Sequence, residues 1–321
     1  MKRKSDPSTS LRASLEALQE EVHLLRQGLQ ELKQKLEEPS SLEGALHRRG
    51  LRIHKADPWE GIAFPRDLDP AFEVELYERL KRYSFRLFLR DVIKRKASFR
   101  ALDLGRFCSP DVVQEYLGFL LKGSIIERIG PIESSQREAS PSALPRASFR
   151  LVAEGVRSFG ETLEWFVAQV FRREFKAPAL WGIRLQEVGT GGDYDVLASV
   201  EGRLVYVEVK SSPPKHIEQE EVDAFWNRVQ ELFPALAIFL VDTELRMKDK
   251  MVVMFEDLLK RRFGRRWRAH PVTRLVDELF VLEGKIIIAN AKPSLVGNLG
   301  RCLRWWFSRR LALSGAEGEE Q

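Results

Sequence analysis

The fold is decided by Gly191–Ala198, GGDYDVLA, together with Tyr206–Ser212, YVEVKSS, which follows the dipeptide Glu201-Gly202. Side chains alternate between the two faces of a strand, so Glu208 and Lys210 share one face and the valines beside them share the other. The valine face is suited to a core. A carboxylate and an ammonium group side by side at a strand end are costly without a purpose, so this pair indicates a functional site.

The dipeptide Glu201-Gly202 predicts a turn that joins this strand to the strand at 195–200. The resulting hairpin would bring Asp195 beside Glu208. Two carboxylates and a lysine that converge on one spot are suited to bind a hard divalent cation and to activate water. The alternative is a charged hairpin whose Glu208 and Lys210 form only a solvated ion pair.

The order of these residues resembles the PD-(D/E)xK nuclease superfamily, which has the restriction-endonuclease-like fold. Asp195 stands on one strand and Glu208-Val209-Lys210 on the next. A predicted amphipathic helix from about Gly160 to Phe175 precedes them and carries Glu164, where many members place a further carboxylate of the metal site. One departure is Tyr194, which stands where the superfamily name has proline.

The resemblance continues beyond the motif and covers roughly residues 150 to 310. A helix rich in acidic and aromatic residues, from Glu218 to Phe233, leads into the apolar strand Ala235 to Val241. The fold class that follows is α/β (α+β), with a mixed sheet flanked by helices. The nuclease-like domain is expected at 153–312, with a disordered tail at 313–321.

The resemblance also implies a chemistry, the metal-dependent hydrolysis of phosphodiester bonds in nucleic acid, with DNA favoured over RNA. Asp195, Glu208 and the carbonyl of Val209 would hold Mg²⁺ or Mn²⁺. Lys210 would orient the attacking water or help to deprotonate it. Glu164 would reach the metal directly or through water. Two alternatives stay open, a non-catalytic DNA-binding regulator and a protein-interaction module.

Composition is that of a soluble, two- or three-domain chain of 321 residues, with 44% hydrophobic and 31% charged residues. The formal net charge of +5 permits a polyanionic partner without demanding one. Cys108 and Cys302 lie far apart and have no metal-ligand spacing, so both are expected to be reduced thiols. No secretory signal or transmembrane run is recognised, which favours a cytoplasmic protein.

The N-terminal segment, residues 1–38, has the pattern of a coiled-coil helix. Apolar residues recur in alternating steps of four and three, as expected for an a/d seam. The residues of this seam are Leu11, Leu15, Leu18, Val22, Leu25, Leu29, Leu32 and Leu36. We expect a homodimer through this seam; the alternative is a helix folded back along its own chain. Residues 39–69 are predicted to be a linker with some docked contacts.

Residues 70–152 resemble a winged helix-turn-helix domain, because three predicted helices are followed by a strand, a polar segment and a second strand. Ser109-Pro110 predicts the start of the third helix and Gly123 its end. The outer face of that helix carries Asp111 and Glu115, which argues against insertion into a DNA groove. A structural or protein-contact role is therefore favoured over sequence-specific DNA reading.

Two features near the C-terminus have open interpretations. A basic cluster is either a solvated surface or a patch that follows the phosphates of nucleic acid. Its members are Arg261, Arg262, Arg265, Arg266 and Arg268. The helix Gly300 to Leu311 carries Trp305-Trp306 among arginines, which suits a membrane surface, base stacking or packing onto the domain.

Overall fold

The computed structural model describes residues 18–29, 41–130, 147–186, 188–189 and 191–316. Within these residues an eight-stranded sheet has the order β1-β5-β6-β7-β8-β11-β10-β9. Its strands are β1 (Arg52–Lys55), β5 (Ala179–Gln186), β6 (Tyr194–Val200), β7 (Arg203–Lys210), β8 (Leu236–Val241), β9 (Thr273–Val276), β10 (Leu279–Leu282) and β11 (Ile286–Asn290). Parallel and antiparallel pairs coexist, so the predicted mixed sheet of an α/β (α+β) fold is confirmed.

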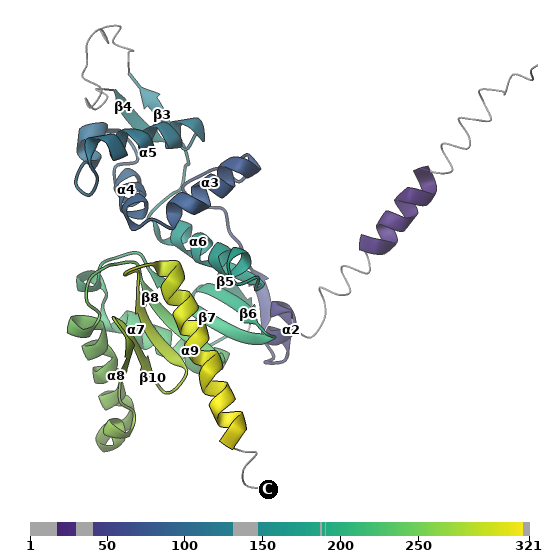
Figure 1. The fold of residues 1–321 in the computed structure, drawn as a ribbon, viewed down its shortest axis with the longest axis vertical. Helices are drawn as coiled ribbons and strands as arrows, with labels where there is room; N and C mark the ends of the chain where they lie inside the picture. Colours follow the sequence, from purple (N-terminus) through teal and green to yellow (C-terminus); the bar gives the residue numbers. More distant parts are fainter. Residues whose placement is uncertain (1–17, 30–40, 131–146, 187, 190, 317–321) are drawn as a thin grey trace, which may run out of the picture.

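Helices cover both faces of this sheet (Figure 1). One core contains the valines of β7 together with α6 (Gly160–Arg173) and α9 (Leu295–Ala316). The other contains α2 (Leu42–His47), α7 (Gln219–Leu232) and α8 (Val253–Phe263). Because both faces are packed, the charged ends of the central strands are the places where polar groups can meet.

The centre of the sheet is built from consecutive elements in the order α6, β5, β6, β7, α7 and β8. β5, β6 and β7 are an antiparallel meander, whereas β7 and β8 are parallel. A parallel pair needs a crossover connection, which α7 provides. The carboxyl ends of β7 and β8 therefore lie side by side, and the backbone N–H of Asp242 donates to the carbonyl of Lys210 at 2.8 Å.

Much of the predicted linker at 39–69 is folded onto the sheet. It forms α2 and β1, and β1 is an edge strand that pairs with β5 through Arg52 opposite Gln186. Trp59 and Phe64 then pack on it, with the Phe64 ring 4.8 Å from that of Trp165. Pairing of edge-strand backbone groups explains this outcome, which the irregular mixture of glycine, proline and charge did not reveal.

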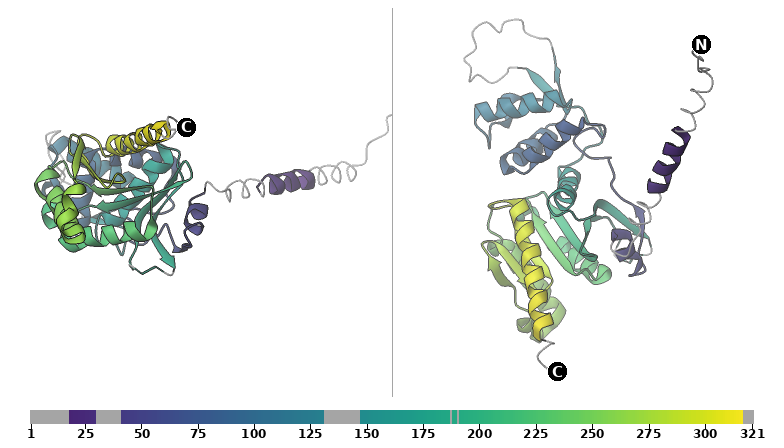
Figure 2. Two further views of the ribbon diagram at one scale, coloured as in Figure 1. Left: turned by 90° about the horizontal axis from the view of Figure 1, so that it is seen from below. Right: turned by 45° about the vertical axis from the view of Figure 1, so that its right-hand side comes forward.

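A smaller unit sits at one end of the large sheet (Figure 2). It contains α3 (Pro70–Leu80), α4 (Tyr83–Lys94) and α5 (Pro110–Lys122), and a sheet of β2 (Phe99–Arg100), β4 (Ser148–Leu151) and β3 (Ile126–Ile129) in that order. The order differs in part from the predicted winged-helix pattern, because the strand β2 was not predicted and a 3₁₀ turn at Ala101–Leu104 stands in place of a short helix. α5, β3 and β4 follow in the predicted order. The wing at 131–146 lies outside the described residues.

The predicted start and end of α5 are confirmed, although for partly different reasons. Ser109 is the N-cap and Pro110 begins the helix. Gly123 is the C-cap, yet its φ of −87° is one that residues other than glycine also adopt. A Cβ there would lie 2.0 Å from the Phe72 ring, so space selects glycine at this position. On the outer face, Glu115 is paired with Arg79 at 2.7 Å.

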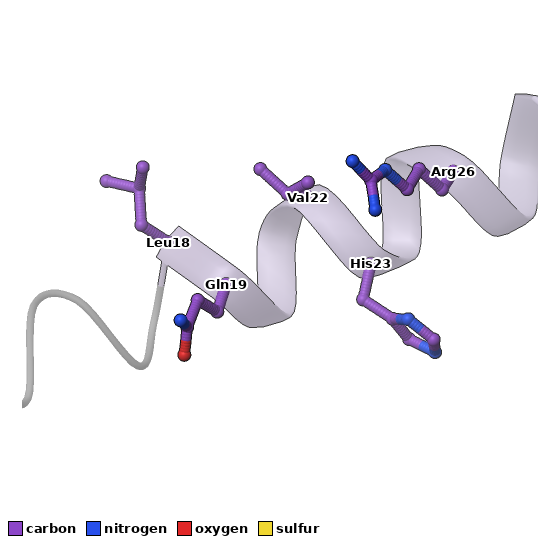
Figure 3. Close-up of a pocket in the computed structure, with 5 residues that line it drawn as sticks. All are labelled: Leu18, Gln19, Val22, His23 and Arg26. Carbon is purple, nitrogen blue, oxygen red and sulfur yellow. The ribbon is translucent and has the colours of Figure 1, made fainter.

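Residues 18–29 of the predicted coiled-coil segment are helical; 1–17 and 30–40 lie outside the described residues. The seam is open to solvent, with Leu18 64%, Val22 42%, Leu25 65% and Leu29 60% exposed. A shallow groove beside Leu18 and Val22 is lined only by residues of this helix (Figure 3). Nothing among the described residues covers the seam, so a fold-back onto the described part of the chain does not occur.

The remaining predictions concern thiols and the C-terminal helix. Cys302 is buried, Cys108 is half-buried, and both are free. Trp306 on α9 is buried in the core, as the packing interpretation expects, while Arg309 lies 5.7 Å over the ring of the partly exposed Trp305. No helix in the described ranges combines the length and the apolar character needed to cross a bilayer.

Candidate functional site

The site is positioned by the hairpin of β6 and β7. Glu201 and Gly202 have φ values of 49° and 70°, the left-handed pair of a tight hairpin turn. Pairing of Val196 with Val207 sets the register and leaves Asp195 beside Glu208. The carboxylate of Asp195 accepts a hydrogen bond from the backbone N–H of Val209 at 2.6 Å. The turn therefore places the two acids as expected.

Glu208 is the most enclosed acid of the site, with 2% of its surface exposed. The ammonium group of Lys210 lies 2.9 Å from its Oε1. Arg228 donates from one guanidinium nitrogen to Oε1 at 3.2 Å and to Oε2 at 3.1 Å. The hydroxyl of Tyr206 also donates to Oε2. A buried carboxylate needs such partners, because its desolvation is otherwise uncompensated.

Glu164 approaches from α6. Its Oε2 would lie 3.8 Å from a Cβ at Gly182, a β5 residue whose φ is +53°. A Cβ there would also lie 2.7 Å from Pro58. Burial, followed by the negative charges of Glu161 and Glu208, raises the pKa of Glu164 to about 8. The carboxyl group is therefore protonated in a large fraction of molecules at neutral pH when no cation is near.

Asp195 responds to the same surroundings. Burial is the main cause that raises its pKa well above the ordinary value, and the charges of Glu208 and Glu164 add to it. The charge of Lys210 and the N–H of Val209 oppose the shift. Glu164, Asp195 and Glu208, together with Lys210, are called the carboxylate site below. Its three acids come from α6, β6 and β7 and repel one another.

Lys210 has a second partner that the sequence reasoning missed. Its ammonium group lies 2.9 Å from Oε1 of Glu221, in the first turn of α7. Burial lowers the pKa of Lys210, but the charges of Glu208 and Asp195 outweigh that effect and leave its pKa above the ordinary value. Lys210 is therefore a cation at neutral pH.

Arg228 was also missed, although one signal was available. It stands three residues after Phe225 and one before Val229, both buried on α7, so the same side of the helix had to face the sheet. An arginine next to a buried stripe requires an acidic or carbonyl partner. The partner, Glu208, is on a strand, and only the packing of α7 against β7 identifies it.

The basic cluster lies at the end of α8 and in the 3₁₀ turn Gly264–Ala269. Arg261 forms a two-point ion pair with Asp223 of α7 at 2.7 and 2.8 Å, and Arg262 donates to Asn227 at 2.7 Å. Arg265, Arg266 and Arg268 are exposed. Two members of the cluster thus help to hold α8 on α7, and three face solvent.

The donor set fits a hard divalent cation in chemistry. Carboxylate and carbonyl oxygens are its preferred ligands, and acids that raise one another's pKa gain from a nearby positive ion. The Glu208 carboxylate is less accessible to a cation, because Arg228 and Lys210 already contact it. No three Asp, Glu, His or Cys side chains within the described ranges are grouped as in a preformed metal site.

Comparison with known proteins gives little guidance. No family model and no curated protein matches the chain. Among solved structures, protein VC1899 from Vibrio cholerae is similar at 15% identity and a TM-score of 0.42, over 68% of this chain and 55% of that one. Can2 from Sulfobacillus thermosulfidooxidans, solved with cyclic tetra-adenylate, is similar at 15% identity and a TM-score of 0.36, over 62% of this chain and 51% of that one.

The chain therefore spans about half the length of these two solved proteins. With TM-scores below 0.5, neither likeness decides a fold family or an activity. The interpretation of the site rests on its own residues.

Proposed function

We propose that the protein is a metal-dependent nuclease that hydrolyses phosphodiester bonds, with DNA favoured over RNA. The observation that carries the proposal is the convergence of Asp195, Glu208 and Lys210 at the end of the β6–β7 hairpin. Buried acids that repel one another are costly to a fold, and such perturbed groups are concentrated at functional sites. The succession α6-β5-β6-β7-α7-β8 agrees with the resemblance to the PD-(D/E)xK superfamily.

In this proposal Asp195, Glu208 and the carbonyl of Val209 hold Mg²⁺ or Mn²⁺, with Glu164 beside them. A bound cation of this kind lowers the pKa of a water ligand and polarises a phosphoryl oxygen. Lys210 is positively charged, because neighbouring acids keep its pKa high. It therefore orients the water and offsets charge on the phosphate, rather than accepting the proton. Glu221 keeps the ammonium group in place.

The alternative of a non-catalytic DNA reader receives less support. The outer face of α5 carries Asp111 and Glu115, and Glu115 is held by Arg79. Acidic groups on that face repel phosphates. A scaffold without chemistry also has no need for three mutually repelling acids. We keep a structural or protein-contact role for the smaller unit.

We further propose that the nuclease is a homodimer through the heptad seam of the N-terminal helix. An a/d stripe buries little area on a single helix and gains its stability from a second one. The exposure of Leu18, Leu25 and Leu29 fits this arrangement.

The function is tested by incubating purified protein with plasmid DNA, linear DNA, single-stranded DNA and RNA in Mg²⁺, Mn²⁺ or EDTA. We expect cleavage that requires the cation and falls by at least about 100-fold in Glu208→Gln, because one ligand and one charge are lost. Glu220→Gln, which changes an exposed acid of α7, is the matched control. Cleavage in EDTA, or full activity of Glu208→Gln, would overturn the proposal.

A further inference from the structure

Arg228 lies against both oxygens of the Glu208 carboxylate. Its contacts to both carboxylate oxygens measure 3.1 and 3.2 Å, and its side chain is 17% exposed. Lys210 and the Tyr206 hydroxyl complete the surroundings of the same carboxylate. A divalent ion at Glu208 would thus face two positive groups at short range, and one of them must withdraw.

Arg228 is the group better placed to withdraw. Lys210 has Glu221 as a second acidic partner, whereas the acidic partner described for Arg228 is Glu208 and its further neighbour is the uncharged Tyr206 side chain. The Nε of Arg228 is buried and has no hydrogen-bond partner among the described residues. A guanidinium offers five N–H donors, so the hydrogen bonding of Arg228 is incomplete at this position.

The loop before β6 leaves space for the guanidinium. A Cβ at Gly192 would lie 2.9 Å from a terminal nitrogen of Arg228, and the φ of Gly192 is +85°. Three residues further along α7, Glu231 accepts from the backbone of Gly189 at 2.5 Å and from the hydroxyl of Tyr194 at 2.8 Å. α7 thus holds this loop with Glu231, while Arg228 lies between the loop and Glu208.

We propose that Arg228 is a displaceable counterion: it neutralises Glu208 in the ion-free protein, leaves when a divalent cation binds, and then donates to a phosphate oxygen of the nucleic acid. A guanidinium suits this exchange, since its fork pairs equally with carboxylate and phosphate oxygens. At Glu208 the positive charge of the cation replaces that of Arg228. At Arg228 the negative charge of the phosphate replaces that of Glu208. This inference rests on the proposed nuclease function.

The experiment measures Mn²⁺ affinity of the full chain without nucleic acid, by electron paramagnetic resonance of the free ion. Arg228→Gln is expected to bind Mn²⁺ about 3- to 10-fold more tightly than the parent, because the competing charge is gone, and to cleave DNA at least 10-fold more slowly. Arg228→Lys, which keeps the charge and perturbs folding least, should bind Mn²⁺ within about twofold of the parent. Arg246→Gln, at an exposed ion pair with Asp249, is the matched control.

Equal or weaker Mn²⁺ binding by Arg228→Gln overturns the claim that Arg228 competes with the cation for Glu208. It would mean instead that Arg228 positions Glu208 for the ion. Tighter binding with unchanged cleavage overturns the phosphate contact. Absence of cleavage by the parent overturns the nuclease function but leaves the order of Mn²⁺ affinities as the test of displacement. Absence of Mn²⁺ binding in every variant overturns both.

Discussion

At the scale of single residues, the carboxylate site contains acids that are shielded from water and repel one another. Glu164 and Asp195 have raised pKa values, chiefly because of burial and then because of neighbouring acids. The positive charges of Lys210 and Arg228 limit that repulsion around Glu208. A proton on Glu164 and the positive charges of Lys210 and Arg228 beside Glu208 both reduce the negative charge of the site. In the proposed function a divalent cation does so as well.

Glu164 makes a contribution to stability that depends on pH. Its pKa is about 8 in the folded protein against 4.5 ordinarily, so the folded state holds a proton that the unfolded chain releases between these values. In EDTA, the contribution of Glu164 to stability should therefore fall as pH rises from 4.5 to 8. Glu164→Gln should flatten this fall and raise the melting temperature at pH 8.5 by a few degrees. Scanning calorimetry from pH 5 to 9 checks this, with Glu220→Gln as control; parallel curves for Glu164→Gln and the parent would contradict it.

At the scale of elements, the N-terminal helix differs from all others in what supports it. The helices around the sheet bury apolar residues in the two cores. The helix at 18–29 leaves its apolar residues exposed, including Leu24 outside the seam at 61%. A short helix with no tertiary contact among the described residues is marginal in water, so this exposure agrees with the proposed pairing of two such helices.

The seam can be tested with neighbouring leucines of the same helix. Leu25→Glu places a charge in the proposed interchain core and should convert a dimer to a monomer in light scattering. Leu24→Glu adds the same charge at an equally exposed position off the seam and should leave the mass unchanged. A monomeric parent, or dimers in both variants, would show that the helix does not join two chains.

At the scale of the whole molecule, a buried ion cluster joins the smaller unit to the large sheet. Arg86 of α4 lies 2.9 Å from Oδ1 of Asp242, and Arg90 lies 2.9 Å from Oδ2. Arg86 and Asp242 are fully buried. The backbone N–H of Asp242 also donates a hydrogen bond to the carbonyl of Lys210. The ion cluster of Arg86, Arg90 and Asp242 therefore lies directly beside the carboxylate site.

Removing the charge of Asp242 from this ion cluster should destabilise the protein strongly. Asp242→Asn leaves Arg86 buried without its counter-charge, which costs about 3–5 kcal/mol of unfolding free energy. Asp249→Asn removes an acid from an exposed pair with Arg246, 3.7 Å apart, and should cost less than about 1 kcal/mol. Urea unfolding of the full chain compares the two. Similar midpoints for both variants would mean that the cluster contributes nothing to the docking of the units.

The sequence by itself determined the parts of this protein that depend on near neighbours along the chain. Period-two alternation and the Glu201-Gly202 turn predicted the hairpin that brings Asp195 to Glu208, because register in a tight hairpin follows from the turn. Ser109 and Pro110 marked the start of α5 for a local reason, whereas Gly123 marked its end although a contact with the distant Phe72 ring selects glycine there. The mixed sheet was expected because the order of the motif residues resembles the PD-(D/E)xK superfamily.

Only the tertiary structure decided which distant groups share the site. Arg228 meets Glu208, and Arg86 meets Asp242, because α7 and α4 pack against particular strands, and sequence spacing carries no information on such contacts. The same holds for β1, whose pairing with β5 is a long-range choice of an edge strand. Local patterns specify elements through backbone geometry and periodicity, whereas the partners of a buried charge are set by packing between elements.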